Sequence, residues 1–98
     1  MSVYLVAELD VKDPEELRKY GEKVPETIAK HGGRYLARRG RLDVLEGKWN
    51  SKLLTIVEFP TREALLAWYN SEEYRPLKAL RQRAADTTLL MAEGVPRH

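Results

Sequence analysis

Two glutamates beside apolar segments are the residues of this chain best suited to acid–base chemistry. Glu8 lies in the run "VYLVAEL" and Glu58 lies in "LLTIVEF". We expect each near the C-terminal end of a central strand, just before the loop to a helix. Two neighbouring carboxylates in a partly dry cleft raise the pKa of one of them, which makes a general acid or base. The alternative is that each is a solvated strand-end residue or pairs with an arginine.

Arg38 and His31 are the predicted partners of these carboxylates. Arg38 is expected on the strand beside that of Glu58, where a guanidinium either orients the carboxylate or anchors an anionic substrate. The alternative for Arg38 is a surface salt bridge or a dimer contact. His31 has an unperturbed pKa near neutrality and is predicted as a secondary proton carrier. Its position in the last turn of a predicted helix also suits a cation favoured by the helix dipole. The other arginines of this region, assigned to solvent and to a hairpin edge, are Arg34, Arg39 and Arg41.

Aromatic side chains are the second group of candidates. Tyr69 and Tyr74 are predicted to bind an aromatic ligand, or else to belong to the core, and Tyr4 is a further ligand-binding candidate. Trp68 shares a helical stripe with Leu65, which favours the core over a ligand pocket.

Composition narrows the chemistry further. The 98 residues suffice for a single domain, contain no cysteine and only two histidines, and carry a net charge of +2. Without cysteine there is no thiolate nucleophile, disulfide or iron–sulfur ligand, so we expect no metal and no cofactor. Basic and acidic residues alternate throughout, whereas a nucleic-acid binder concentrates its positive charge. No apolar run reaches the roughly 18 residues of a membrane span, and the first ten residues do not form a signal peptide. We therefore predict a cytoplasmic protein that binds neither nucleic acid nor membrane.

Extended and helical segments alternate along the chain. A helix is expected to begin at Asp13 as N-cap and to end at Gly32-Gly33, with a kink or break near Val24 because Pro25 lies inside it. Thr61 caps a short helix, and a further helix begins around Pro76. The extended segments are 3–9, 34–45 with a bend at Gly40, 53–59 and 87–94. The second and third are expected to form a long hairpin arm with its turn at "GKWNSK".

The resulting order, βαββαβ, predicts a ferredoxin-like α+β fold whose four-stranded sheet is mainly antiparallel and carries its helices on one face. Right-handed crossovers are expected to place the first and third strands side by side and parallel at the sheet centre. The opposite face would present apolar side chains, namely Tyr4, Val6, Leu54 and Ile56. Monomeric domains rarely expose such a patch, so we predict a homodimer that buries roughly 800 Å² or more per subunit through this face.

Five motifs in order resemble a known bacterial family, the domain of unknown function 1330. They are "GGRYLAR" at 32–38, "VLEGKW" at 44–49, "IVEFP" at 56–60, "AWYNSEEYRPLKALR" at 67–81 and "AEGV" at 92–95. The resemblance covers nearly the whole chain. One departure is Arg39, which stands where the family often has glycine.

The resemblance implies a dimeric α/β barrel but no established catalytic residue. That superfamily includes cofactor-independent monooxygenases, isomerases such as muconolactone isomerase, and haem enzymes, with sites between the sheet and the helices or in the barrel. It also includes members without known chemistry. We therefore expect a homodimeric protein that binds a small molecule. One version of this expectation is a cofactor-independent enzyme that uses carboxylate acid–base chemistry. The alternative is a non-catalytic binding or interaction module whose sheet face serves dimerisation only.

Overall fold

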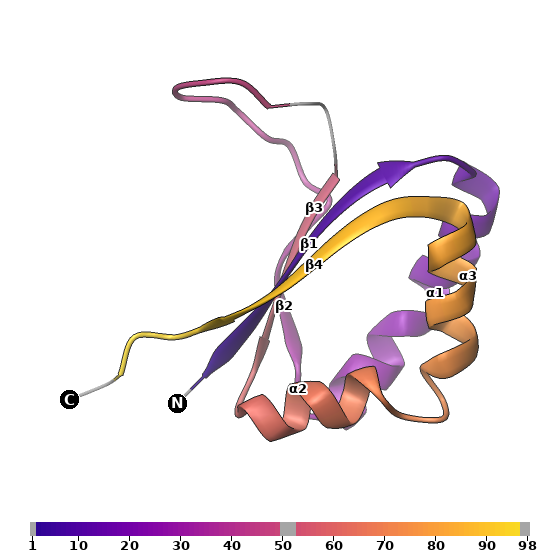
Figure 1. The fold of residues 1–98 in the computed structure, drawn as a ribbon, viewed down its shortest axis with the longest axis vertical. Coiled ribbons are helices and arrows are strands. Elements are labelled where there is room, and N and C mark those ends of the chain that lie inside the picture. Colours follow the sequence, from indigo (N-terminus) through magenta and orange to yellow (C-terminus); the bar gives the residue numbers. More distant parts are fainter. Residues whose placement is uncertain (1, 50–52, 97–98) are drawn as a thin grey trace.

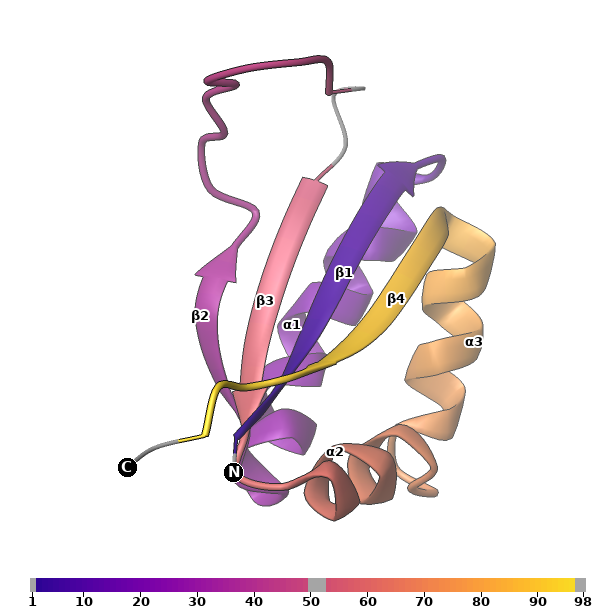
Figure 2. The same ribbon diagram turned by 60° about the vertical axis from the view of Figure 1, so that its left-hand side comes forward.

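Four strands form one sheet in the order β2–β3–β1–β4, and three helices cover one face of it (Figures 1 and 2). The computed structural model describes residues 2–49 and 53–96. Its elements are β1 (Val3–Val11), α1 (Pro14–Lys30), β2 (Arg34–Arg38), β3 (Leu53–Phe59), α2 (Arg62–Tyr69), α3 (Arg75–Ala84) and β4 (Ala85–Glu93). None of these helices is long and apolar enough to cross a membrane.

The ferredoxin-like order is confirmed, but the predicted direction of the central pair is wrong. β1 and β3 are neighbours and run antiparallel, with Leu5 opposite Val57. The reason lies in the crossovers. Each helical connection joins two parallel strands that have a third strand between them: β3 separates β1 from β2, and β1 separates β3 from β4. Every hydrogen-bonded pair of strands is therefore antiparallel.

Local signals set the ends of α1 as expected. Asp13 Oδ1 accepts a hydrogen bond from the Glu16 amide at 3.2 Å, and Pro14 occupies the first turn. At the other end Gly32 has a φ of 79°, and the Gly33 amide donates to the Ile28 carbonyl at 3.0 Å, a Schellman-type ending. α1 runs unbroken through Pro25, so a break near Val24 is wrong, whereas the alternative, a kink, stays a prediction.

The two faces of the sheet differ as the alternation predicts. Alternate residues of β1, from Val3 to Leu9, are buried under the helices. The opposite face, here called the open face, has no covering layer within the described chain (Figure 1). Across its centre Val6 pairs with Ile56 and with Leu90, and Leu90 is 59% exposed.

The predicted hairpin arm is shorter than expected. β2 ends at Arg38, and residues 39–49 form no strand, so the expected extended segment to Leu45 is wrong. This connection rises beyond the end of the sheet (Figure 2), and its Leu45 is 94% exposed. Part of the predicted turn, residues 50–52, lies outside the described residues.

Candidate functional site

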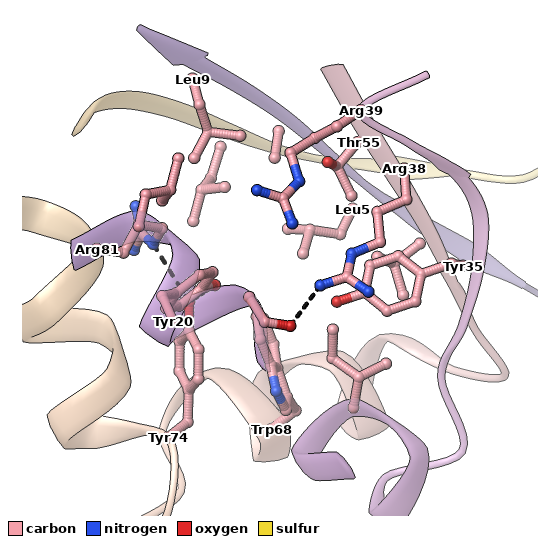
Figure 3. Close-up of a pocket in the computed structure, with 16 residues that line it drawn as sticks. Leu5, Leu9, Tyr20, Tyr35, Arg38, Arg39, Thr55, Trp68, Tyr74 and Arg81 are labelled. Atoms are coloured by element: carbon pink, nitrogen blue, oxygen red, sulfur yellow. Dashed lines mark hydrogen bonds between the residues drawn. The ribbon is translucent and has the colours of Figure 1, made fainter. Parts of the chain in front are cut away.

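A cavity of about 50 Å³ lies between the helices and the covered face of the sheet. Apolar side chains such as Leu5, Val57 and Leu89 line it. Besides Thr55 and Trp68, its polar lining consists of three tyrosines and three arginines (Figure 3), namely Tyr20, Tyr35, Tyr74, Arg38, Arg39 and Arg81. Among the described residues no acidic side chain lines the cavity.

Tyr20, Tyr74 and Arg81 form a hydrogen-bonded group at one side of the cavity. The hydroxyls of Tyr20 and Tyr74 are 2.8 Å apart, and Arg81 Nε donates to Tyr74 Oη at 3.3 Å. Burial, reinforced by the neighbouring Tyr74, raises the pKa of Tyr20 well above its ordinary value. The Tyr20 hydroxyl therefore stays protonated at neutral pH and acts as a hydrogen-bonding group rather than a base.

Arg38 and Arg39 flank the cavity on the β2 side, next to Gly21 of α1 (Figure 3). Arg38 Nη2 donates to the carbonyl oxygen of Gly21. Pro25, four residues further on, has no amide hydrogen to offer that carbonyl. Gly21 also has no side chain, and a Cβ there would lie 2.7 Å from Arg39 Nη2 and 3.3 Å from Arg38 Nη2. Gly21 therefore provides the space for the Arg38 guanidinium, and Pro25 leaves the Gly21 carbonyl available as its acceptor.

A β-bulge in β2 determines which face Arg38 occupies. Arg34 pairs with Glu58 on the open face, whereas Arg38 pairs with Thr55 on the cavity side. Strict alternation would place residues 34 and 38 on the same face. The register shift between Tyr35 and Ala37 reverses the alternation, as a bulge does. The guanidinium of Arg38 then lies over the Tyr35 ring, 4.8 Å from its centroid.

Arg39 reaches the cavity through an unusual backbone conformation. Its φ of 51° lies in the left-handed region, and its amide donates to the Leu54 carbonyl at 2.9 Å. The assignment of Arg39 to solvent and hairpin edge is therefore wrong in part, because this side chain lines the cavity.

Replacing Arg39 by glycine should raise stability. A non-glycine residue in the left-handed region costs roughly 1–2 kcal/mol, and glycine avoids this cost at the expense of chain entropy. Arg39→Ala is the matched control because it removes the same side chain and keeps the strain. Urea denaturation should give Arg39→Gly a free energy of unfolding about 1 kcal/mol above that of Arg39→Ala. Equal stabilities would show that the backbone at this position is unstrained.

The predicted carboxylate pair does not form. Glu58 lies opposite Tyr4, whereas Glu8 lies opposite Leu54, four residues further along β1. That spacing corresponds to roughly 13 Å along a strand. Because β1 and β3 are antiparallel, their C-terminal ends lie at opposite ends of the sheet, and the proposed neighbouring carboxylates are wrong.

Glu58 pairs with Arg34 rather than with Arg38. Arg34 Nε lies 2.7 Å from Glu58 Oε1, and Tyr4 Oη donates to Glu58 Oε2 at 3.3 Å. The hydrogen bond from Arg34 is the main reason that the pKa of Glu58 is lowered. A carboxylate held ionised in this way, with its side chain only 12% exposed, suits a structural ion pair. The predicted alignment of Arg38 with Glu58 is wrong, because the bulge intervenes.

Glu58 should stabilise the fold above its pKa and lose this effect in acid. The folded-state pKa is lower than the usual 4.5, so the unfolded chain binds the proton first as the pH falls. The difference in melting temperature between the protein and Glu58→Gln should be largest near neutrality and should shrink below about pH 4.5. Glu46→Gln, which removes an exposed carboxylate of the β2–β3 connection, serves as control. A difference that does not vary with pH would contradict the assignment.

The remaining predicted residues lie outside the cavity, except for Tyr74. His31 caps α1, with Nδ1 2.9 Å from the Thr27 carbonyl and 3.9 Å from Glu73 Oε1. Tyr4 is on the open face with Glu58. Lys78 Nζ lies over the ring of Tyr69, 3.9 Å from its centroid. Of the seven predicted site residues, the structure brings only Arg38 and Tyr74 together around the cavity.

Sequence reasoning missed the site roles of Tyr20, Tyr35 and Arg81. For Arg81 a signal exists, since it follows Leu77 by four residues and precedes Ala84 by three, and all three are buried. A charged residue on the apolar stripe of a helix marks a buried charge.

Comparison with known proteins agrees with the fold. RPA0582, a protein of unknown function from Rhodopseudomonas palustris, is 17% identical with a TM-score of 0.75 over 98% of this chain and 84% of that chain. SnoaB, a cofactor-independent oxygenase from Streptomyces nogalater, is 10% identical with a TM-score of 0.67 over 98% and 95%. A dimeric ferredoxin-like protein of unknown function from Jannaschia sp. is 11% identical with a TM-score of 0.68 over 96% and 100%. At these identities the likeness establishes the fold alone.

Sequence comparison supplies the family. No curated protein matches the chain. The model of the domain of unknown function DUF1330 matches residues 2–95, as the five motifs predicted. Since this match spans nearly every residue, the chain belongs to the DUF1330 family.

Proposed function

We propose that the protein binds a small organic molecule that contains a ring, in the cavity between its helices and its sheet. The observation that carries the proposal is the lining itself, in which apolar and aromatic walls surround a few convergent polar groups. Ligand sites have this composition, and an ordinary core has no use for three arginines on one cavity.

The cavity must widen to admit such a ligand. Its 50 Å³ is less than the roughly 150 Å³ that holds benzene in an engineered protein cavity. At its β2 side lie the long side chains of Arg38, which is exposed, and of Arg39, which is half-buried. Their displacement would enlarge the cavity without moving the sheet or α1.

Binding is tested with phenol, p-cresol and 2-naphthol as probes. We expect amide resonances of Leu5, Val57 and Leu89 to shift on titration in two-dimensional NMR spectra. The variant Ala7→Leu fills the cavity from its buried wall and should abolish these shifts. Ala79→Leu adds the same atoms to an exposed position of α3 and should bind as the unmodified protein does. Unperturbed cavity amides at millimolar probe, or normal binding by Ala7→Leu, would overturn the proposal.

A cofactor-independent oxygenase is the enzymatic form of this proposal. The fold likeness to SnoaB supports it, as do the tyrosine hydroxyls and guanidinium groups, which can stabilise a developing substrate anion. Catalysis by Glu8 or Glu58 receives no support, since neither lines the cavity. Oxygen consumption with naphthols, above the rate in buffer and lost in Ala7→Leu, would support an oxygenase; equal rates would leave a binding protein.

We also propose that two copies of the chain pack through their open faces. Val6, Ile56 and Leu90 form an apolar row across that face, and a dimeric ferredoxin-like protein shares the fold. A second sheet packed against this row would remove it from water.

Leu90→Asp tests the dimer without disturbing the single chain, because this side chain is already 59% exposed. Light scattering at micromolar concentration should show a dimer for the unmodified protein and a monomer for Leu90→Asp. Leu66→Asp, an exposed leucine of α2, should remain dimeric. A monomeric unmodified protein would end the proposal.

A further inference from the structure

Arg81 carries a buried charge that the described chain does not neutralise. The residue is 4% exposed, and the hydrogen bond from Nε to Tyr74 Oη is the single polar contact of its side chain among the described residues. No carboxylate of residues 2–49 and 53–96 forms an ion pair with it. A guanidinium stays protonated at all ordinary pH values, and leaving it buried without a counter-charge is costly.

The two Nη groups of Arg81 are not fully buried. No buried side-chain nitrogen among the described residues lacks a hydrogen-bond partner. Because the two Nη groups have no partner in the described chain, they must remain accessible to a water-sized molecule. Arg81 borders the cavity on one side and a surface pocket with Tyr69, Gln82 and Asp86 on the other. Asp86 is already paired with Lys12 at 3.1 Å.

The two tyrosines beside Arg81 add a further donor. Tyr20 and Tyr74 share one hydrogen bond, and Tyr74 Oη accepts from Arg81. Two hydroxyl groups have two hydrogens, and the shared bond uses one of them. The other is available to an acceptor in the cavity, since neither hydroxyl has another partner among the described residues. Arg81 and the tyrosines therefore present several donors, and no acidic acceptor lies with them in the cavity.

We propose that Arg81, with the Tyr20–Tyr74 hydroxyl pair, is an anion subsite that binds the carboxylate of a small aromatic acid. Guanidinium groups match planar carboxylates through two parallel hydrogen bonds. The ring then lies against the apolar wall of Leu5, Val57 and Leu89, and Arg38 and Arg39 close over it. This inference rests on the proposed binding function and adds the charge and orientation of the ligand.

The test compares benzoate with benzyl alcohol, a neutral molecule of nearly the same shape, by calorimetry and NMR on the full chain. The unmodified protein should bind benzoate at least tenfold more tightly. Arg81→Met removes the charge and keeps an unbranched apolar stem, so the preference should vanish while benzyl alcohol binds as before. Arg83→Met removes an exposed arginine of the same helix and should keep the preference. Arg81→Lys keeps the charge without the planar pair of donors and should retain only part of the preference.

A second measurement does not depend on ligand. Without benzoate, Arg81→Met should melt at a higher temperature than the unmodified protein, because it removes an uncompensated buried charge. At one fixed concentration, benzoate should raise the melting temperature of the unmodified protein clearly more than that of Arg81→Met, whereas benzyl alcohol should raise both by the same amount. If Arg81→Met does not fold, the test rests on Arg81→Lys. A reduced preference for benzoate in this variant supports the anion subsite, and an unchanged preference contradicts it.

The failures are distinguishable. If both probes bind with equal affinity and Arg81→Met changes neither, the anion subsite is wrong and the binding function stands. If neither probe binds at millimolar concentration, both proposals are overturned.

Discussion

Trp68→Ala should cost about 3–5 kcal/mol of the free energy of unfolding, as large-to-small changes of buried aromatic residues do. Trp68 is 1% exposed, and its ring centroid lies 4.1 Å from that of Tyr74 and 5.7 Å from that of Phe59. It joins the helices to the sheet at the base of the cavity (Figure 3). Small domains have only about 5–15 kcal/mol of total stability, so the variant should be close to unfolding at room temperature. A urea titration followed by circular dichroism measures the loss.

The indole hydrogen bond contributes separately from the packing of the ring. Trp68 Nε1 donates to Thr27 Oγ1 at 2.9 Å, and that hydroxyl donates to the Val24 carbonyl at 2.8 Å. Thr27→Val leaves the buried indole N–H without an acceptor, at about 1–3 kcal/mol. Trp68→Phe combined with Thr27→Val should cost less than the sum of the single variants, since the pair is then removed together. Additive costs, or a loss under about 1 kcal/mol for Trp68→Ala, would contradict this account.

Gly33→Ala should destabilise the protein by about 1–3 kcal/mol, the usual cost of overpacking a core. An added Cβ would lie 2.7 Å from Ile28 Cγ2 and 2.8 Å from Phe59 Cε1. Both neighbours are buried, so neither can move aside without disturbing others. The close approach of the chain to Phe59 therefore requires glycine here.

Gly40→Ala is the matched control for Gly33→Ala. A Cβ at Gly40 would have no atom within 4 Å, and its φ lies outside the left-handed region. This substitution should be neutral or stabilise the protein slightly, because alanine restricts the unfolded chain. If Gly33→Ala and Gly40→Ala melt at the same temperature, the packing at Gly33 is looser than the distances imply.

Local signals predicted the elements well because they act over a few residues. Asp13 and Thr61 cap helices, Gly32 adopts the left-handed conformation, and the apolar alternation of β1 gives its two faces. The prediction that the central strands are parallel is wrong because their relative direction depends on both helical crossovers together. Each crossover skips the strand that the other one starts from. No single segment carries that information.

The candidate site depended on two features that local patterns do not reveal. Nothing in "RYLAR" signals the bulge that turns Arg38 to the cavity. The burial of Arg81 depends on how α3 packs against α1 and β4. The predicted carboxylates failed for the same reason, since the placement of Glu8 and Glu58 relied on strand direction and on uninterrupted alternation.

The hydrogen bond between Arg38 and the Gly21 carbonyl keeps the cavity closed on its β2 side. Because Pro25 has no amide hydrogen, the Gly21 carbonyl lacks its usual donor within the helix. The side chain of Arg38 on β2 supplies the hydrogen bond instead. If Arg38 swings away to admit a ligand, the carbonyl needs water in its place. This hydrogen bond therefore favours the closed cavity, and breaking it is part of the free-energy cost of admitting a ligand.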